Sequence, residues 1–177
     1  MLTFDPSKHE YRWNGIRVPC VSDALNLLFG VFPGSDPEPA RHGTMIHDLC
    51  QRYLISFDRS LSTEPEFLGF IKWCDKEKIT PFEKIETEEM FYSVHGYAGT
   101  RDIRLAIRDW IIDIKTGAEI VNRHSQQLNA YDNGEKNRLS NLYWNGTDWI
   151  LKDRKFSKEQ FRHFLCAVDI LNFNNQF

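Results

Sequence analysis

The chain has 177 residues, of which 41% are hydrophobic and 14% aromatic, enough for one substantial core, so we expect a single domain over residues 1–177. No run approaches the roughly 18 apolar residues of a membrane span, and residues 1–10 are polar, so we expect a cytoplasmic protein without a membrane partner. The net charge of -3 argues against a protein that coats nucleic acid by bulk positive charge, although basic residues can still gather locally.

The cysteines lie far apart, with no spacing typical of a zinc site or an iron–sulfur cluster. They are Cys20, Cys50, Cys74 and Cys166. Several fall in apolar stretches, which favours buried, reduced thiols. We therefore expect no iron–sulfur cluster.

The first third of the chain predicts a hairpin, a short helix and a loop. Alternating apolar and polar residues around Asn14-Gly15 indicate a tight hairpin over residues 11–18. Ser22 is the predicted N-cap of a helix that ends at Phe29. Glycine and proline residues then predict a loop from Gly30 to Pro39, a candidate flap.

The rest of the chain alternates between helical and strand patterns. Apolar residues at helical spacing predict helices over residues 40–57 and 65–78, and period-two alternation predicts three antiparallel strands between Phe82 and Lys115. A helix over 122–138, weakened by Gly134, a hairpin over 141–152 and a helix over 157–173 follow. This order predicts an α/β fold with a central mixed sheet flanked by helices and an N-terminal hairpin.

The ribbon from Gly99 to Gly117 has one apolar face if its turn is centred on Arg108-Asp109. Ile103 then lies opposite Ile114, Leu105 opposite Ile112, and Ile107 opposite Trp110. On the other face Asp102 lies opposite Lys115, and Arg104 opposite Asp113. Two carboxylates and an ammonium group therefore converge on one small patch.

Such a patch suits two alternatives. Carboxylates, a main-chain carbonyl such as that of Ile114 and waters are the oxygen ligands that Mg²⁺ prefers, and Lys115 can reach a phosphate bound there. Alternatively, Asp102, Asp113 and Lys115 are solvated cross-strand ion pairs without catalytic meaning. The spacing by itself leaves both open.

Several ordered segments resemble the PD-(D/E)XK nuclease superfamily, specifically its RecB-like and phage or mitochondrial exonuclease branch. They are Val18 to Ser22, Gly43-Thr44-Met45-Ile46-His47, Glu88, Gly99-Thr100-Arg101-Asp102, Asp113-Ile114-Lys115, and Gln127 with Tyr131. The resemblance spans nearly the whole chain and implies a restriction-endonuclease-like core.

The resemblance also implies roles for individual residues. His47, Asp102, Asp113 and the carbonyl of Ile114 would bind Mg²⁺ or Mn²⁺, with Asp102, Asp113, Lys115 and Glu88 as the catalytic group. Gln127 and Tyr131, four apart on one helix face, would hold the DNA backbone. The alternatives are a partly buried structural histidine, a solvated run of glutamates around Glu88, and an amphipathic surface pair.

Basic residues flank this predicted site and could bind DNA phosphates, or could be solvated ion-pair partners. They are Arg101, Arg104, Arg123, His124 and Lys136. The function we expect is a metal-dependent deoxyribonuclease, favoured as a phage-type exonuclease of recombination or repair that works in the host cytoplasm. The alternatives are a restriction-type or structure-specific endonuclease and a non-catalytic nucleic-acid-binding module. A homo-oligomer or a recombination partner protein is possible.

Overall fold

The computed structural model describes residues 1–30 and 37–174. In chain order the elements are β1 (Leu2–Asp5), β2 (Glu10–Trp13), β3 (Ile16–Val18), α1 (Val21–Phe29), α2 (Pro37–Ser56), α3 (Pro65–Lys76), β4 (Ile85–Tyr92), β5 (Ala98–Leu105), β6 (Trp110–Lys115), α4 (Val121–Asp132), β7 (Arg138–Trp144), β8 (Trp149–Arg154) and α5 (Lys158–Asn174). Most of the predicted flap lies outside the described residues, and its end, from Pro37, begins α2.

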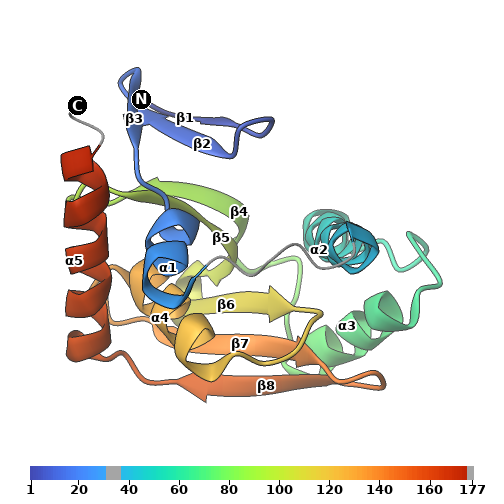
Figure 1. Ribbon diagram of the computed structural model, residues 1–177. Helices are drawn as coiled ribbons and strands as arrows, with labels where there is room; N and C mark the ends of the chain where they lie inside the picture. Colours follow the sequence, from blue (N-terminus) through green and yellow to red (C-terminus); the bar gives the residue numbers. More distant parts are fainter. Residues whose placement is uncertain (31–36, 175–177) are drawn as a thin grey trace.

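The central sheet is mixed, as predicted. Its strand order is β4-β5-β6-β7-β8, with β6 and β7 parallel and all other neighbours antiparallel. The parallel pair is joined through α4, because parallel strands need a crossover connection. The predicted N-terminal hairpin is confirmed as β2 and β3, and β1 adds a third antiparallel strand that the sequence did not predict. Figure 1 shows this small sheet standing beyond the β4 edge of the large one.

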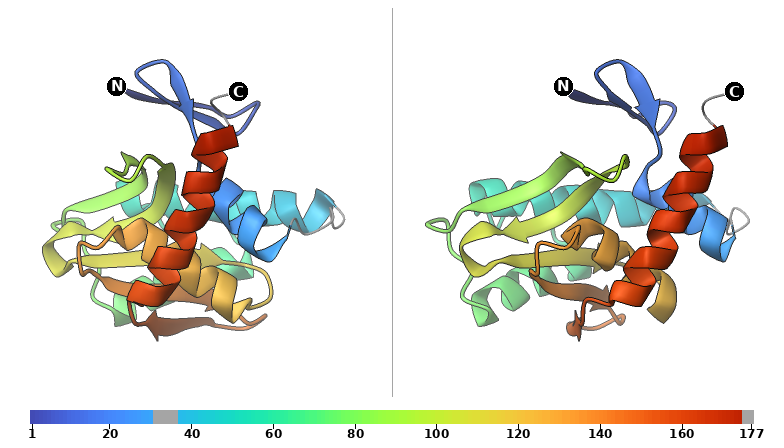
Figure 2. Two further views of the ribbon diagram at one scale, coloured as in Figure 1. Left: turned by 60° about the vertical axis from the view of Figure 1, so that its left-hand side comes forward. Right: turned by 90° about the vertical axis from the view of Figure 1, so that its left-hand side faces the viewer.

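Helices cover both faces of the central sheet (Figure 2). One core lies between the sheet and the helices α2 and α3, and contains Ile46, Tyr53, Phe70, Ile103, Leu105 and Ile112. The second lies between the other face and the helices α1, α4 and α5, and contains Leu25, Ile111, Leu128 and Phe164. Because both faces are covered, β6 is buried at every position except its last, Lys115, as in a strand covered on two sides.

The predicted pairing of β5 with β6 was wrong by two residues. The observed partners are Ile103 with Ile112, Arg104 with Ile111, and Leu105 with Trp110. The connection is longer than a tight turn, because residues 106–108 form a 3-10 helix. Arg108 donates to the carbonyls of Glu77 and Lys78 and to Glu83 at 2.5 Å, which holds this connection against the segment before β4.

The shift has consequences for individual side chains. Its even size leaves Ile103, Leu105, Ile112 and Ile114 on one buried face, because side chains alternate with a period of two. Ile107, predicted to face Trp110, is instead 71% exposed in the connection. Arg104 does not lie opposite Asp113, nor Asp102 opposite Lys115.

Two helix ends also differ from the prediction. The N-cap of α1 is Cys20, not Ser22: the Asp23 backbone N–H donates to the Cys20 sulfur, and the Asp23 carboxylate accepts the Cys20 backbone N–H at 3.2 Å. This reciprocal capping box fixes where the helix begins. The helix α4 ends at Asp132 because Asn133 adopts a left-handed conformation, so the helix predicted to weaken at Gly134 in fact ends there.

Among the helices of the described residues, none has both the length and the apolar character that a membrane span requires.

Candidate active site

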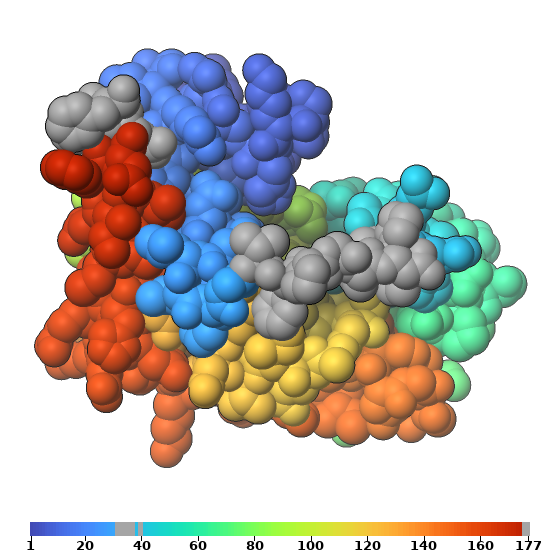
Figure 3. Space-filling view, viewed as in Figure 1, coloured from blue at the N-terminus to red at the C-terminus, as the bar shows by residue number. Residues whose placement is uncertain are grey.

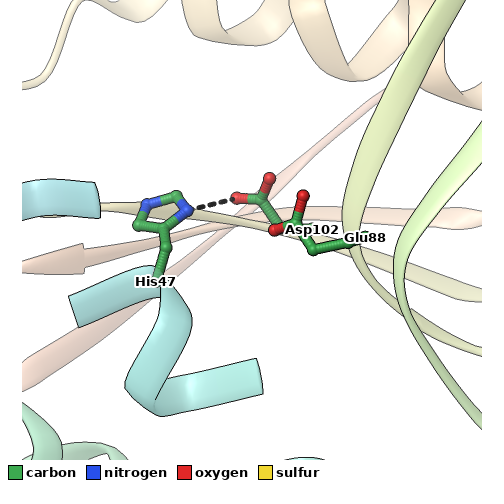
Figure 4. A group of neighbouring side chains, drawn as sticks. All are labelled: His47, Glu88 and Asp102. Carbon is green, nitrogen blue, oxygen red and sulfur yellow. Dashed lines mark ion pairs between the residues drawn. The ribbon is translucent and has the colours of Figure 1, made fainter. Parts of the chain in front are cut away.

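Three side chains predicted from separate segments meet at the surface near the β4 edge of the sheet. His47 comes from α2, Glu88 from β4 and Asp102 from β5, and one ligand atom of each lies within 4.8 Å of the others. His47 Nδ1 lies 3.6 Å from Asp102 Oδ2 (Figure 4). We call these three residues the rim cluster. The N-terminal sheet and α2 flank the surface where β4 reaches the outside (Figure 3).

Glu88 has an unusual backbone conformation for a strand residue. Its φ of 49° lies in the left-handed region, which a non-glycine residue enters at a cost of about 1–2 kcal/mol. The flanking pairs, Thr87 with Ile103 and Glu89 with Arg101, place it opposite Asp102. Glu86 and Glu89 instead form ion pairs with Arg104 and Arg101. Glu88 is therefore distinct from its neighbours, which the sequence could not show.

The position of His47 depends on the close approach of α2 to the end of β6. A Cβ on Gly43, one helical turn before His47, would lie 2.9 Å from Thr116 Oγ1, so only glycine fits without a shift. A pocket of about 560 Å³ opens beside this contact and the rim cluster. Its lining includes His47, Glu88, Thr116, Thr44 and Gln51, so a ligand in it reaches two of the three rim residues.

A second group lies deeper, on β6 and β7. Lys115 Nζ donates to Asp113 at 2.8 Å, and Asn141 Nδ2 donates to Asp113 Oδ2 at 2.8 Å. We call Asp113, Lys115 and Asn141 the inner network. Asp113 and Asn141 are fully buried, while the Lys115 side chain keeps 20% of its surface exposed. Burial raises the pKa of Asp113 against the opposing pull of Lys115. Burial by itself would lower the Lys115 pKa. The negative charges of Asp113 and Asp102 have the larger effect and raise the Lys115 pKa.

Asp102 connects the two groups. Its Oδ2 accepts the backbone N–H of Ile114 at 2.8 Å, which ties the rim to the strand that carries Asp113 and Lys115. The carboxylate is thereby held from β6 as well as from its own strand. The metal-binding role of the Ile114 carbonyl stays a prediction.

Gln127 and Tyr131 lie on one face of α4, as predicted. Gln127 Nε2 donates to the Tyr131 hydroxyl at 2.7 Å, and Tyr131 is buried. Burial, followed by the charges of Asp113 and Asp102, raises the pKa of Tyr131, so its hydroxyl stays protonated. Helix α4 also contacts β6, the strand that carries Asp113 and Lys115. The role of Gln127 and Tyr131 in holding DNA stays a prediction.

Four of the five flanking basic residues have side-chain partners inside the protein. Arg101, only 3% exposed, donates to the Tyr131 carbonyl and pairs with Glu89, and Arg104 pairs with Glu86. Arg123 donates to the Leu25 carbonyl and to Asn26, and His124 Nδ1 lies 2.7 Å from the Tyr143 hydroxyl. These contacts match the ion-pair and structural alternative more closely than a free phosphate-binding surface. DNA binding by these four residues stays a prediction.

Sequence reasoning missed Asn141, which stood at the start of a predicted hairpin without any motif. It also missed Thr116 and Gln51 in the pocket lining. Buried thiols were predicted without distinguishing among the four cysteines; Cys20, Cys50 and Cys74 are buried, whereas Cys166 is exposed. Burial raises the pKa of Cys20 to about 12, which keeps this thiol protonated.

Comparisons with known proteins add little. No protein-family model and no curated protein matches the chain. Among solved structures, the crystal structure of SSO0001 is similar over 86% of this chain and 84% of that one, at 15% identity and a TM-score of 0.40. A similarity this weak supports no conclusion about activity.

Proposed function

We propose that the chain is a metal-dependent deoxyribonuclease that hydrolyses phosphodiester bonds, with exonucleolytic digestion as its favoured mode. The observation that carries this proposal is the meeting of His47, Glu88 and Asp102 beside the Asp113–Lys115 pair. The five residues come from α2, β4, β5 and β6, and each lies in a segment that resembles the nuclease superfamily. The alternative, solvated surface ion pairs without catalytic meaning, gives no reason for residues from four elements to lie together.

The donor atoms of the rim cluster fit a divalent cation. Two carboxylates and an imidazole can coordinate Mn²⁺, and the carboxylates suit Mg²⁺ when waters complete the shell. The strained backbone of Glu88 supports a ligand role, because such conformations cluster at functional sites. A metal bound there would polarise the scissile phosphate and lower the pKa of the attacking water.

Other parts of the candidate site have separate roles in the proposed reaction. Asp102, held by the Ile114 N–H, presents its carboxylate to the rim. Lys115 has a raised pKa and stays protonated, so it can neutralise charge that develops on the phosphate. The open pocket beside α2 would receive the substrate strand. Exonuclease action is favoured by the family resemblance alone.

The proposal is tested with end-labelled linear and closed circular DNA, each incubated with Mg²⁺, Mn²⁺ or EDTA, and with Asp113→Ala as the matched inactive variant. Metal-dependent loss of linear DNA alone, absent in Asp113→Ala, is the expected result. Nicking of circles would replace the exonuclease by the endonuclease alternative. DNA binding without any cleavage would favour the non-catalytic module, and cleavage that survives EDTA or Asp113→Ala would contradict the proposal.

A further inference from the structure

Asn141 is placed against Asp113 by the pairing of two strands that are distant in sequence. The parallel register of β6 with β7 makes Asp113 and Asn141 direct partners. Both side chains are fully buried, and the Asn141 amide donates to Asp113 Oδ2 at 2.8 Å. A buried carboxylate is costly unless its oxygens accept hydrogen bonds. Asp113 is a predicted metal ligand. Asn141 therefore donates a hydrogen bond to its carboxylate in addition to the one from Lys115.

The orientation of the Asn141 amide is fixed by Arg154. Arg154 Nε lies 3.0 Å from Asn141 Oδ1. An arginine guanidinium can only donate, so the amide atom that faces Arg154 must be the oxygen. The amide nitrogen is then the atom that faces Asp113. Arg154 is itself held by the carboxylate of Glu119 and by the Tyr143 hydroxyl at 3.4 Å.

We propose that Asn141 is a positioning residue that fixes the Asp113 carboxylate for metal binding, with Arg154 setting the direction of the Asn141 amide. This inference rests on the proposed function, since it takes Asp113 as part of a metal site. The physical reason is that hydrogen bonds to a ligating carboxylate hold it in one orientation and so reduce the cost of binding the ion. The chain Asp113–Asn141–Arg154–Glu119 leads from the buried strand to the protein surface.

Ser140 provides a matched control for a merely structural role. It neighbours Asn141 on β7, is fully buried, and makes two side-chain hydrogen bonds, with Trp110 at 2.8 Å and with Asp153 at 2.6 Å. Neither partner belongs to the rim cluster or to the inner network. Ser140→Ala therefore removes a comparable number of buried hydrogen bonds from the same strand without touching Asp113.

The experiment compares wild type, Asn141→Ala, Ser140→Ala and Arg154→Gln in two assays. One measures the Mg²⁺ concentration that half-saturates cleavage of linear DNA, together with kcat at saturating metal. The other measures binding of Mn²⁺ alone by calorimetry, which needs no cleavage. Thermal unfolding of each variant confirms that it is folded at the assay temperature.

Asn141→Ala is expected to raise half-saturating Mg²⁺ and to weaken Mn²⁺ binding by about tenfold or more, the range found when partners of metal ligands are removed. Arg154→Gln, whose amide can donate or accept, should give a smaller change in the same direction. Ser140→Ala should leave both metal constants unchanged even if it lowers the melting temperature. Equal metal constants for Asn141→Ala and wild type, or equal changes in Asn141→Ala and Ser140→Ala, would overturn the inference.

The two proposals fail in different ways. If wild type binds Mn²⁺ and cleaves no DNA, the nuclease proposal fails, while the Mn²⁺ constants of the variants still decide the role of Asn141. If wild type cleaves DNA and Asn141→Ala behaves like wild type, only the positioning role is lost. If wild type binds no Mn²⁺, the positioning role is overturned directly.

Discussion

The inner network and the rim cluster are adjacent but are built in opposite ways. Asp113 is buried, with hydrogen bonds from Lys115 and Asn141 to its carboxylate. In the rim cluster, the contact between His47 and Asp102 is a longer one of 3.6 Å, and Glu88 stands at the surface. The Asp113 carboxylate is therefore held in one orientation by the protein, while the rim cluster presents carboxylate and imidazole atoms near the surface that a bound cation can coordinate.

This difference separates stability from ligand binding. Removing one member of a buried charge pair leaves the other uncompensated, so stability and activity should fall together in the inner network. The rim side chains are exposed at Glu88 and partly exposed at His47 and Asp102. A substitution at His47 or Glu88 should remove few contacts within the protein, so activity should fall with little loss of stability. Substitutions in the two groups therefore test this difference.

The largest effect is expected for Lys115→Ala. Loss of the ammonium group should lower the cleavage rate by about 10³-fold, the equivalent of about 4 kcal/mol in the transition state. The buried Asp113 loses its counter-charge, so the free energy of unfolding should fall by about 3 kcal/mol. Single-turnover cleavage and urea unfolding measure the two effects. A variant with full activity would remove Lys115 from the proposed mechanism.

A pH effect on stability is expected from His124, beside the inner network. Burial, followed by the charge of Lys115, lowers its pKa to about 4, against about 6.5 in the unfolded chain. Between these pH values the His124 imidazole is protonated in the unfolded chain and neutral in the folded protein. The stabilisation is therefore complete above about pH 6.5 and is lost as pH falls towards 4, by roughly 3 kcal/mol in total.

Urea unfolding of wild type and His124→Asn between pH 7.5 and 4 measures this effect. The carboxylates titrate in both proteins, so the difference between the two curves isolates the imidazole. Asparagine can present an oxygen near the position of Nδ1 and so can keep a contact with the Tyr143 hydroxyl. A difference that stays constant with pH would show that His124 titrates normally.

In the rim cluster, His47→Ala should weaken metal binding with little effect on folding. Loss of a ligand contact of about 2 kcal/mol corresponds to about 30-fold in the half-saturating metal concentration. The free energy of unfolding without metal should change by no more than about 0.5 kcal/mol. Calorimetric Mn²⁺ titration and urea unfolding in EDTA measure the two quantities. A stability loss comparable to that of Lys115→Ala would break the distinction between rim and interior.

The smallest expected effect is the difference in stability between Glu88→Gly and Glu88→Ala. Both substitutions remove the carboxylate, but only glycine relieves the backbone strain. Because φ is positive there, Glu88→Gly should be more stable than Glu88→Ala by about 1 kcal/mol. Both variants should lose metal affinity to the same degree. Thermal unfolding with and without Mn²⁺ tests this, and equal stability of the two variants would mean that residue 88 is not strained.

Local patterns predicted most elements because they depend on near neighbours. The Asn14-Gly15 and Asn145-Gly146 turns both connect antiparallel strands, as expected of this dipeptide. Alternation correctly assigned Ile103, Leu105 and Ile112 to one buried face. Even the wrong register preserved this face, since alternation determines which side a residue takes but not its partner.

Register and partners needed contacts between distant segments. The predicted pairing of β5 with β6 was wrong because it assumed a tight turn, whereas the connection is a 3-10 helix whose Arg108 bonds to residues 77, 78 and 83. No local pattern links Arg108 to those residues. Glu88 could not be separated from Glu86 and Glu89 until its position opposite Asp102 was known. Arg101 looked like a surface cation and is buried, because a sequence does not show which charges pair inside.

The sequence alone predicted the α/β class, the two faces of β5 and the residue types of a candidate metal-binding group, because hydrophobic periodicity and short motifs are local properties. Only the folded structure shows that His47, Glu88 and Asp102 form the rim cluster, while Asp113 is buried in the interior. It also places Asn141 against Asp113. These placements depend on which strands become neighbours, and strand pairing is fixed by the packing of the whole sheet against its helices.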